Sequence, residues 1–259
     1  MRKYLDTAIK AAQCAGTFIE QSRGELGNVD YKGRADMVTD VDRASEDILI
    51  DQIRSAFPSH AILAEESNSK ENTAEFRWII DPLDGTTNYV HKYQHYAVSI
   101  ALQQHGETIV GLVYNPHSDE MFTAIKGEGA RLTQNRMHVS SSDVLSRSLL
   151  STGIPYEMSD RWHKSMDLFK MFYSRTHGVR RDGSAALDLC YVAAGRFDGF
   201  WELDLHPWDV AAGMLIVEES GGKVSRFNGS ESSIFDDEIL ASNGKIHEQM
   251  QDVIRMVPV

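Results

Sequence analysis

The sequence predicts a layered α+β fold built around one continuous core. Residues 96–124 alternate apolar and polar side chains over at least three segments separated by turn residues at 105–107 and 115–118, which indicates an antiparallel meander. From Ser148 onward, strand-like and helix-like segments alternate, which is typical of layered α/β structure. No internal repeat or Pro/Ser-rich linker divides the 259 residues, and a chain of this length can bury a large core.

Two amphipathic helices are expected in the first 60 residues. Apolar residues recur at steps of three and four, which predicts an opening helix over residues 5 to about 24. A second helix is predicted between Asp40, as its N-cap, and Pro58, which closes it. The stretch between the helices, residues 27–35, is polar and contains glycine, so we expect a flexible loop or a hairpin there.

Two short apolar strands are predicted next, and acidic residues follow each of them. Residues 61–64 form the first strand, and Glu65 and Glu66 come directly after it. Residues 78–80 form the second strand, which ends on Asp81. Both strands therefore present carboxylates at their carboxyl ends.

The second half of the chain is expected to alternate strands with helices. A strand begins at Ser148, a helix spans residues 162–172, and a further helix opens at Gly183 after another strand. A strand near residues 197–201 then leads into a helix that starts at Pro207.

The change of pattern after the meander predicts two halves that share one structural unit. The N-terminal half, residues 1–145, is α+β and carries Glu65 together with the acidic segment 81–88. The C-terminal half, residues 146–259, is α/β and carries Asp209.

The charge balance excludes some classes of function. With 26 Lys and Arg against 38 Asp and Glu, the formal net charge is −12. Non-specific nucleic-acid binding needs a basic footprint, so we expect no nucleic-acid binding from charge. A net negative surface also repels anionic lipid, and no stretch approaches the ~20 apolar residues of a membrane helix, so no membrane association is expected.

The cysteines and the first residues of the chain indicate in which cellular compartment the protein is expected. Cys14 and Cys190 lie far apart without metal-ligand spacing, so free reduced thiols are expected. Polar residues interrupt any signal-peptide run near the start of the chain. We therefore predict a soluble cytoplasmic protein.

The most informative segment follows the strand at residues 78–80. Asp81 ends that strand, Pro82 forces an extended turn, and Asp84 comes three residues later, before Gly85 and two threonines that can open a helix. Two carboxylates so close together repel each other unless they are protonated or bridged by a cation. Hard oxygen ligands favour Mg²⁺ or Mn²⁺. The backbone N–H groups of residues 85–87 would then suit a phosphate.

The same residues also have a plainer interpretation, in which Asp84 caps a helix and Asp81 makes an ordinary turn. Taken alone, the segment favours neither interpretation. The metal interpretation gains support from Glu65 and Glu66 after another strand and from Asp209 in the first turn of the helix at Pro207. Three separate elements thus present carboxylates at their ends.

Four segments, in order along nearly the whole chain, together resemble the inositol monophosphatase family. This family consists of lithium-sensitive, Mg²⁺-dependent phosphomonoesterases that share a fold with fructose-1,6-bisphosphatase. The resemblance implies a layered α-β-α-β-α sandwich. The segments are Asp36-Met37-Val38-Thr39-Asp40-Val41-Asp42, Glu65-Glu66-Ser67, Asp81-Pro82-Leu83-Asp84-Gly85-Thr86-Thr87-Asn88, and Trp208-Asp209-Val210-Ala211-Ala212-Gly213 followed by Gly221-Gly222.

The resemblance also implies roles for the acidic residues and two or three Mg²⁺ ions, with Mn²⁺ as a substitute. Glu65, Asp81 and the Leu83 carbonyl would hold the first ion. Asp81 would bridge to a second ion, which Asp84 and Asp209 also bind, and Glu65 with water would support a weaker third. A water molecule on the first ion would be the nucleophile, and the second ion would stabilise the leaving alkoxide.

Further positions match the family pattern. Thr86, with Glu66 behind it, would orient the water, and Thr39 and Asp42 would shape the hydrogen bonds around that pair. Glu66, Thr86 and Asp84 are therefore the candidate catalytic residues. The candidate substrate contacts are Asp84, Gly85, Thr86, Thr87, Gly183, Ser184, Ala185, Glu202 and Asp209. Residues 183–186 are equally compatible with an ordinary helix start.

The histidines are not predicted to form a ligand set, because none is paired with a second histidine at metal-ligand spacing on one helix. His91, His95 and His105 are expected to be structural, and His206 to orient the turn before Asp209. Arg180 and Arg181 are expected to be surface residues, with a second anion or a neighbouring subunit as alternatives.

The substrate stays open among small phosphate esters. Inositol-1-phosphate is the first choice, and relatives act on fructose-1,6-bisphosphate, histidinol phosphate, nucleotide bisphosphates or NADP(H). A haloacid-dehalogenase-type phosphatase is a rival, although its paired acids lie two residues apart, whereas Asp81 and Asp84 lie three apart. A regulatory binding protein that contacts transcription or RNA-processing machinery is the other class. A homodimer is expected from the family and from the frequency of two-fold assemblies.

Overall fold

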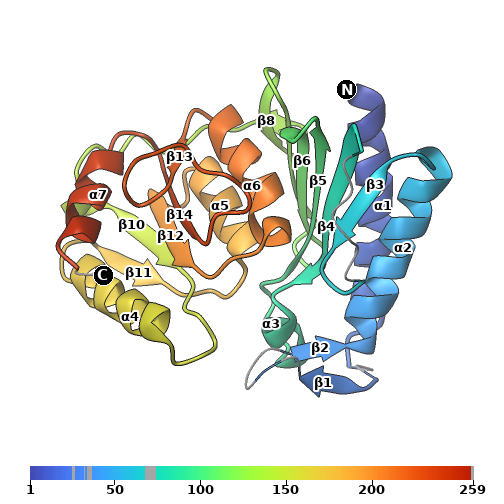
Figure 1. Cartoon of the computed structure of the whole chain (residues 1–259), viewed down its shortest axis with the longest axis horizontal. Coiled ribbons are helices and arrows are strands. Elements are labelled where there is room, and N and C mark those ends of the chain that lie inside the picture. Colours follow the sequence, from blue (N-terminus) through green and yellow to red (C-terminus); the bar gives the residue numbers. More distant parts are fainter. Residues whose placement is uncertain (25–26, 32, 34–36, 68–73, 258–259) are drawn as a thin grey trace.

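Five layers of helices and sheets make up the computed structural model, which describes residues 1–24, 27–31, 33, 37–67 and 74–257. A helix pair, a sheet, a second helix pair, a second sheet and a third helix pair follow one another along the long axis (Figure 1). The predicted α-β-α-β-α layering is therefore confirmed. The two inner helices are α5 (Ala185–Ala193) and α6 (Pro207–Glu219), which lie between the two sheets.

The first layer consists of α1 (Arg2–Gln21) and α2 (Asp40–Ala56), which pack on each other and on the first sheet. The predicted N-cap of α2 was wrong by one residue. Thr39 has the extended backbone of a cap and accepts hydrogen bonds from the N–H groups of Val41 and Asp42, while Asp40 is already helical. The Asp42 carboxylate bonds back to the Thr39 N–H, which completes a capping box.

The first sheet confirms the predicted meander and extends it. β3 and β4 pair in parallel, and every later neighbouring pair is antiparallel. The strands, in spatial order, are β3 (Ala61–Ala64), β4 (Phe76–Asp84), β5 (Ala97–Gln104), β6 (Glu107–Asn115), β7 (Glu120–Ile125), β8 (Gly129–Leu132) and β9 (Asn135–Arg136).

The strand β4 does not end at Asp81, which corrects the expectation of a turn at Pro82. The strand continues through Pro82 to Asp84, and its register against β5 shifts between Asp81, opposite Ser99, and Asp84, opposite Ala97. Proline lacks an N–H, so within a strand it is tolerated at such an irregularity.

The second sheet has β12 at its centre and mixed strand directions. β10 pairs in parallel with β11 and β12, and β14 is antiparallel to both β12 and β13. The helices α4 (Asp160–Tyr173) and α7 (His247–Arg255) form the outermost layer. The strands are β11 (Gly178–Arg180), β10 (Leu149–Thr152), β12 (Gly199–Leu203), β14 (Glu238–Ser242) and β13 (Lys223–Ser225).

The largest core lies between the two sheets and includes residues of both halves of the chain. Phe122 of the first sheet, Ile216 of α6 and Phe200 of the second sheet are each fully buried within it. A second core lies under α1 and α2, and a third lies under α4 and α7, where the rings of Phe172 and Trp201 are 4.2 Å apart. Burial of apolar surface stabilises a fold by about 25 cal/mol per Å², and this burial holds the layers together.

Two small elements lie at the end of the first sheet. β1 (Val29–Tyr31) pairs antiparallel with β2 (Met37–Thr39), which is the hairpin alternative of the loop predicted at residues 27–35. Within that stretch, residues 32, 34 and 35 lie outside the described residues, as does Asp36 of the first matching segment. The short helix α3 (Thr86–Val90) follows β4 directly.

The predicted boundary between residues 145 and 146 falls in a short 3₁₀ turn, Leu145–Arg147, that links the two sheets. The division into halves stays a prediction, since helices of the second half pack directly on strands of the first.

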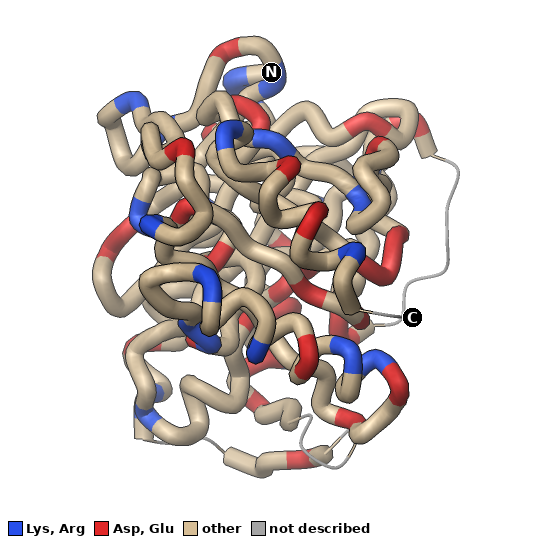
Figure 2. Tube along the Cα trace, turned by 90° about the vertical axis from the view of Figure 1, so that its left-hand side faces the viewer, with Lys and Arg blue, Asp and Glu red and all other residues tan. Residues whose placement is uncertain are grey.

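Charges of both signs are distributed over the outer layer of α4 and α7. On the side that faces the viewer in Figure 2, Lys and Arg are interspersed with Asp and Glu. Across the described ranges, no helix combines the length and the apolar character needed to cross a bilayer.

The first prediction concerns acid stability and rests on the buried His247. The hydroxyls of Ser225 and Ser242 lie 2.8 Å from its two ring nitrogens, and burial, with Lys223 second, lowers the pKa of His247 to about 4 from 6.5. Below pH 6.5 the unfolded chain binds a proton that the folded chain excludes. The free energy of unfolding should therefore fall by roughly 3 kcal/mol between pH 6.5 and pH 4 because of this group.

Urea unfolding of the wild type and of His247→Gln at pH 7 and pH 4.5 measures this effect. The variant should lose less stability between the two pH values than the wild type. His138→Gln, a change at an exposed position, should lose as much stability as the wild type. An equal loss in all three proteins would contradict the assignment.

Candidate active site

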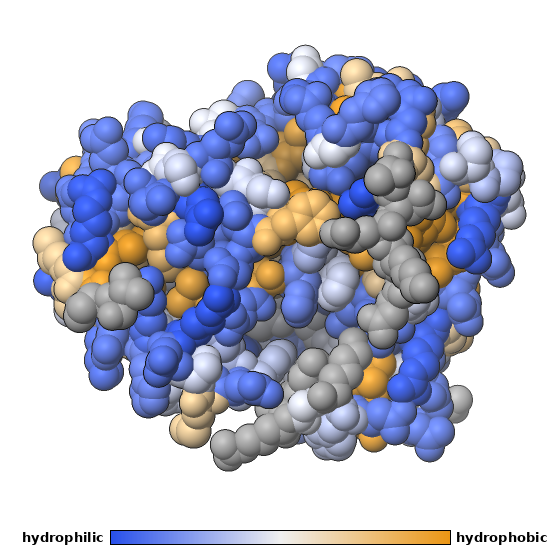
Figure 3. Space-filling model, in the orientation of Figure 1, coloured by the Kyte–Doolittle hydropathy of each residue, from blue (hydrophilic) through white to orange (hydrophobic). Residues whose placement is uncertain are grey.

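A cleft of about 480 Å³ lies between the two halves and contains most of the sequence-predicted site residues. The face seen in Figure 3 is hollowed near its centre, between the parts that carry the two sheets. Three of the predicted residues, Thr39, Asp42 and Glu66, are outside the lining. Those that line it are Glu65, Asp81, Leu83, Asp84, Gly85, Thr86, Thr87, Gly183, Ser184, Ala185, Glu202 and Asp209.

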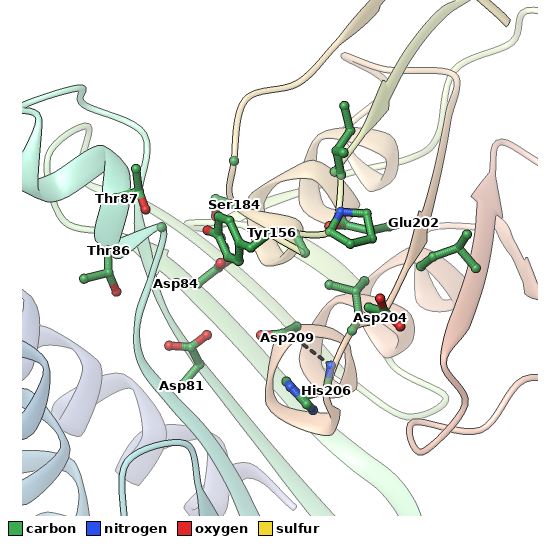
Figure 4. A pocket seen from close by; sticks show the side chains of 18 of the residues that line it. Asp81, Asp84, Thr86, Thr87, Tyr156, Ser184, Glu202, Asp204, His206 and Asp209 are labelled. Atoms are coloured by element: carbon green, nitrogen blue, oxygen red, sulfur yellow. Dashed lines mark hydrogen bonds between the residues drawn. The ribbon is translucent and has the colours of Figure 1, made fainter. Parts of the chain in front are cut away.

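Asp81 and Asp84 reach the cleft from the irregular end of β4. The Leu83 N–H donates to Oδ1 of Asp81 over 2.9 Å, and the Ser45 hydroxyl of α2 donates to the Pro82 carbonyl over 2.9 Å. The register shift between the two acids turns both carboxylates toward the cavity, where Figure 4 shows them beside Asp209. The side chain of Asp81 is only 2% exposed.

Residues of the second half hold the carboxylate of Asp84. Its Oδ2 accepts a hydrogen bond of 2.6 Å from the Ser184 hydroxyl and one of 2.8 Å from the Ala186 N–H. Ser184 is also the N-cap of α5, whereas the sequence placed the start of that helix at Gly183. The first turn of α5 thus fixes one oxygen of Asp84.

The turn into α3 requires glycine at position 85. Its φ is +95°, and a Cβ atom there would lie 2.9 Å from the carbonyl oxygen of His95. The next residue, Thr86, donates its hydroxyl hydrogen to Oδ1 of Asp42 at 2.6 Å, and the Leu83 carbonyl lies 3.0 Å away. The other oxygen of Asp42 is bound by Thr39.

Asp42 is therefore buried beneath Thr86, with 1% of its surface exposed. The sequence analysis predicted that Asp42 lies close to Thr86. Burial raises the pKa of Asp42, an effect that its bonds to Thr39 and Thr86 oppose. Its carboxylate links the start of α2 to the start of α3.

The acids after β3 are held from α2 by a residue that the sequence analysis did not single out. The backbone N–H of Glu66 donates to Glu46 over 2.8 Å, and Glu46 itself is 3% exposed. Glu65 lines the cleft beside Asp81. Glu46 lies on the apolar side of α2, and an acidic residue at such a position is the sequence signal of a buried, bonded carboxylate.

Asp209 enters the cleft from the first turn of α6. Its Oδ2 accepts the His206 N–H over 2.7 Å, which is the dashed contact in Figure 4. The ring of His206 stacks on Trp208 with centroids 4.9 Å apart. Pro207 at the helix start and this capping bond together fix the side chain of Asp209.

Three of the clustered acids, Asp81, Asp84 and Asp209, have raised pKa values. Burial raises the pKa of Asp81 well above its usual value, and the charges of Glu65, Asp84 and Asp209 raise it further. Burial likewise raises the pKa of Asp209 well above its usual value. For Asp84, burial raises the pKa to about 6 against the opposing bonds from Ser184 and Ala186. Full ionisation of these acids is therefore unfavourable unless a proton or a cation compensates their charge.

The far wall of the cleft holds Glu202 on β12. Burial raises the pKa of Glu202 to about 8, and the backbone of Gly153 and the charge of Arg181 oppose this shift. A Cβ atom on Gly153 would lie 1.7 Å from Oε1 of Glu202, so only glycine fits at that position. The carboxyl of Glu202 thus lies directly against the backbone of Gly153 in the wall of the cleft.

Sequence reasoning missed part of the lining. The loop after β10 contributes Tyr156, which is 46% exposed (Figure 4). Arg161 and Asp204 also line the cleft. Arg161 bridges Asp204 and Asp237. Nothing local in this loop marks it as part of a site.

The second prediction concerns Ser184, which both caps α5 and binds Asp84. Ser184→Ala should lower the free energy of unfolding by about 1 kcal/mol, the usual cost of a lost cap. For the phosphate-ester hydrolysis that the family resemblance predicts, it should also lower kcat/KM by about tenfold or more, because a carboxylate at the site loses a fixed partner. Ser184→Thr keeps the hydroxyl and should retain most of both. Urea unfolding and phosphate release check the pair, and equal losses in the two variants would contradict this role.

The fold and the acid-lined cleft define a class of protein that the comparisons identify. The family model of the inositol monophosphatase family matches residues 1–256, so the chain belongs to that family. The resemblance seen in the sequence is confirmed.

Relatives of the chain carry two kinds of name. The "Nus factor SuhB" of Escherichia coli (strain K12) is 42% identical over 253 residues, which cover 96% of this chain and 95% of that protein. The "Phosphatase IMPL1, chloroplastic" of Arabidopsis thaliana is 40% identical, covering 96% of this chain and 69% of that protein. A solved inositol monophosphatase from Anabaena (Nostoc) sp. PCC 7120 is 42% identical, covers 99% and 97% of the two chains, and has a TM-score of 0.89.

Proposed function

We propose that this protein is a Mg²⁺-dependent phosphomonoesterase that hydrolyses a small phosphorylated polyol, with inositol-1-phosphate as the first candidate. Family membership supports a phosphatase. The observation that carries the proposal is the convergence of Asp81, Asp84 and Asp209 from β4 and α6 in one cleft.

The donor set fits hard divalent cations. Glu65, Asp81, Asp84, Asp209 and the Leu83 carbonyl all offer oxygen atoms, which Mg²⁺ and Mn²⁺ prefer. The raised pKa values of Asp81 and Asp209 arise from burial and from neighbouring negative charges, which a cation would offset. When bound, such ions supply an activated water and charge stabilisation for the leaving oxygen.

The chain's own residues bind and orient the ester. Asp42 accepts from Thr86 and so fixes the rotamer of its hydroxyl, which leaves the oxygen lone pairs of Thr86 available to a water molecule. Ser184 and the Ala186 N–H hold one oxygen of Asp84, so its other oxygen faces the cleft. On the opposite wall, Glu202 is placed to bind a hydroxyl of the polyol.

A protonated Glu202 suits a hydroxyl-rich substrate. With its pKa raised to about 8 by burial, it carries a proton at neutral pH and can both donate to and accept from a substrate hydroxyl. A neutral group on this wall also avoids repelling the phosphate ester.

A phosphate-release panel tests the proposal. Inositol-1-phosphate, fructose-1,6-bisphosphate, histidinol phosphate, a nucleotide bisphosphate and NADP⁺ are each supplied with Mg²⁺, with EDTA and with Mg²⁺ plus Li⁺. We expect Mg²⁺-dependent, Li⁺-inhibited release that is fastest with inositol-1-phosphate. Release from none of them would contradict the enzyme assignment, whereas preference for another ester would replace the substrate alone.

A covalent mechanism makes a different prediction at Asp81. A haloacid-dehalogenase-type enzyme would form an aspartyl phosphate on this residue, and the proposed mechanism forms none. Acid quenching during turnover followed by mass spectrometry should find Asp81 unmodified. A phosphorylated Asp81 would overturn the mechanism.

A regulatory role is the second candidate, and the name of the Escherichia coli relative favours it. In that case the chain would contact transcription machinery through its surface, with or without catalysis. Binding of the full chain to purified transcription complexes, compared between the wild type and Asp84→Asn, separates the two roles. Binding that survives the substitution would show a function independent of phosphate release.

A further inference from the structure

A second group of ligand-type side chains lies where the two halves meet, and it shares no residue with the proposed Mg²⁺ ligands. His95, Asp182 and Asp188 each offer one ligand atom, and these atoms all lie within 4.8 Å of one another. His95 comes just before β5, Asp182 lies in the loop before α5, and Asp188 lies on α5 itself. The group joins His95 to two acids that lie close together much later in the chain.

Two of these side chains are buried with atoms that have no hydrogen-bond partner in the part of the chain that the structure describes. These atoms are Nε2 of His95, whose side chain is 8% exposed, and Oδ1 of Asp188, whose side chain is 1% exposed. Burial of an unpaired polar atom costs free energy, so such atoms usually have a ligand or a water molecule. The separation of the three groups leaves room for one between them.

The charge around Asp188 favours a cation as that ligand. Burial raises the pKa of Asp188 well above its usual value, and the charges of Glu202, Asp182 and Asp84 act in the same direction against Arg181 alone. Burial lowers the pKa of His95, which keeps the imidazole neutral and its lone pair available. A neutral imidazole and two carboxylates form a ligand set for a divalent ion.

The backbone around the group is fixed in advance by Asn88. Its amide nitrogen donates to the carbonyls of His95 and Asp182, over 2.7 Å in each case, and lies 3.3 Å from the carbonyl of Gly183. The ring of Tyr191 packs edge-on against His95 at 5.6 Å. The ligand positions are therefore held without a metal, which reduces the entropy lost on binding.

We propose that His95, Asp182 and Asp188 form an additional cation site that binds a divalent transition-metal ion such as Zn²⁺. Imidazole favours Zn²⁺ and related ions, whereas Mg²⁺ prefers oxygen donors alone. Three protein ligands leave a fourth position for water. A bound ion would link the start of β5 to α5, next to the loop whose Ser184 holds Asp84.

Zn²⁺ binding to the full chain in excess Mg²⁺ tests the site. Isothermal titration should give one Zn²⁺ per chain, and His95→Gln should weaken its affinity at least tenfold. The matched control is His91→Gln, which removes an exposed histidine four residues away and should bind as the wild type does. Asp209→Asn disables the proposed Mg²⁺ cluster and should leave this Zn²⁺ equivalent intact.

Two further measurements distinguish the loss of the cation site from a folding defect. Asp182→Asn, in the half-buried loop, should also weaken Zn²⁺ binding, so a folding defect of His95→Gln alone would not decide the question. Zn²⁺ should raise the melting temperature of the wild type and of Asp209→Asn but of neither site variant. Wild-type Zn²⁺ affinity in both His95→Gln and Asp182→Asn, or a Zn²⁺ equivalent lost only in Asp209→Asn, would overturn the proposal while leaving the phosphatase assignment untouched.

Discussion

Asp84→Asn is expected to lower Mg²⁺-dependent phosphate release by about a hundredfold to a thousandfold while the chain stays folded. In the proposed mechanism its carboxylate binds a cation and stabilises charge in the reaction, and the loss of one such group costs about 10²–10³ in kcat. The asparagine oxygen can still accept from Ser184 and from the Ala186 N–H. The contact between β4 and α5 should therefore survive.

Phosphate release with saturating Mg²⁺ measures the activity, and the melting temperature in EDTA measures the fold. Asp51→Asn is the matched control, because it makes the same chemical change at an exposed position of α2. Turnover in Asp84→Asn equal to that of the control would contradict the catalytic role and would favour a purely regulatory protein.

Asp81→Asn is expected to have opposite effects on activity and on stability. It should abolish phosphate release, and it should also raise the melting temperature of the metal-free chain by at least about 3 °C. Burial and three neighbouring acids raise the pKa of Asp81 well above its usual value, so its charge destabilises the metal-free fold. One pKa unit corresponds to about 1.4 kcal/mol, and 1 kcal/mol moves the melting temperature of a chain of this size by roughly 2–4 °C.

Added Mg²⁺ should raise the melting temperature of the wild type and leave that of Asp81→Asn nearly unchanged. Thermal unfolding at pH 7.5 with EDTA and with Mg²⁺ provides the comparison, and Asp51→Asn should follow the wild type in both. A metal-free Asp81→Asn protein less stable than the wild type would contradict the repulsion among these acids, because the asparagine oxygen can still accept the bond from Leu83.

Local patterns in the sequence were enough to predict most of the fold. The meander at residues 96–124 follows from alternation and turn residues that lie next to each other in the chain. The cap at Thr39 was missed by one position because Thr39 and Asp40 both have side-chain oxygens, and the backbone conformation and the reciprocal bond from Asp42 decide between them. The course of β4 past Pro82 depends on its pairing with β5, which no local pattern reveals.

The acidic cluster could be predicted because its residues belong to compact segments that each have a recognisable form. Its surroundings could not be predicted in this way. Glu46 binds the Glu66 backbone across 20 residues of sequence, and His95 meets Asp188 only because α5 packs against the first sheet. Such contacts depend on the packing of whole layers rather than on spacing along the chain.

The bond between Asp84 and Ser184 joins residues that are 100 positions apart, and Asp209 lies further along still. During synthesis, the strand that carries Asp81 and Asp84 therefore leaves the ribosome well before the residues that complete the cleft. A nascent or truncated chain that stops before α6 lacks a full set of acidic ligands. In the proposed phosphatase, phosphate release thus requires that synthesis has passed α6 and that both halves have docked.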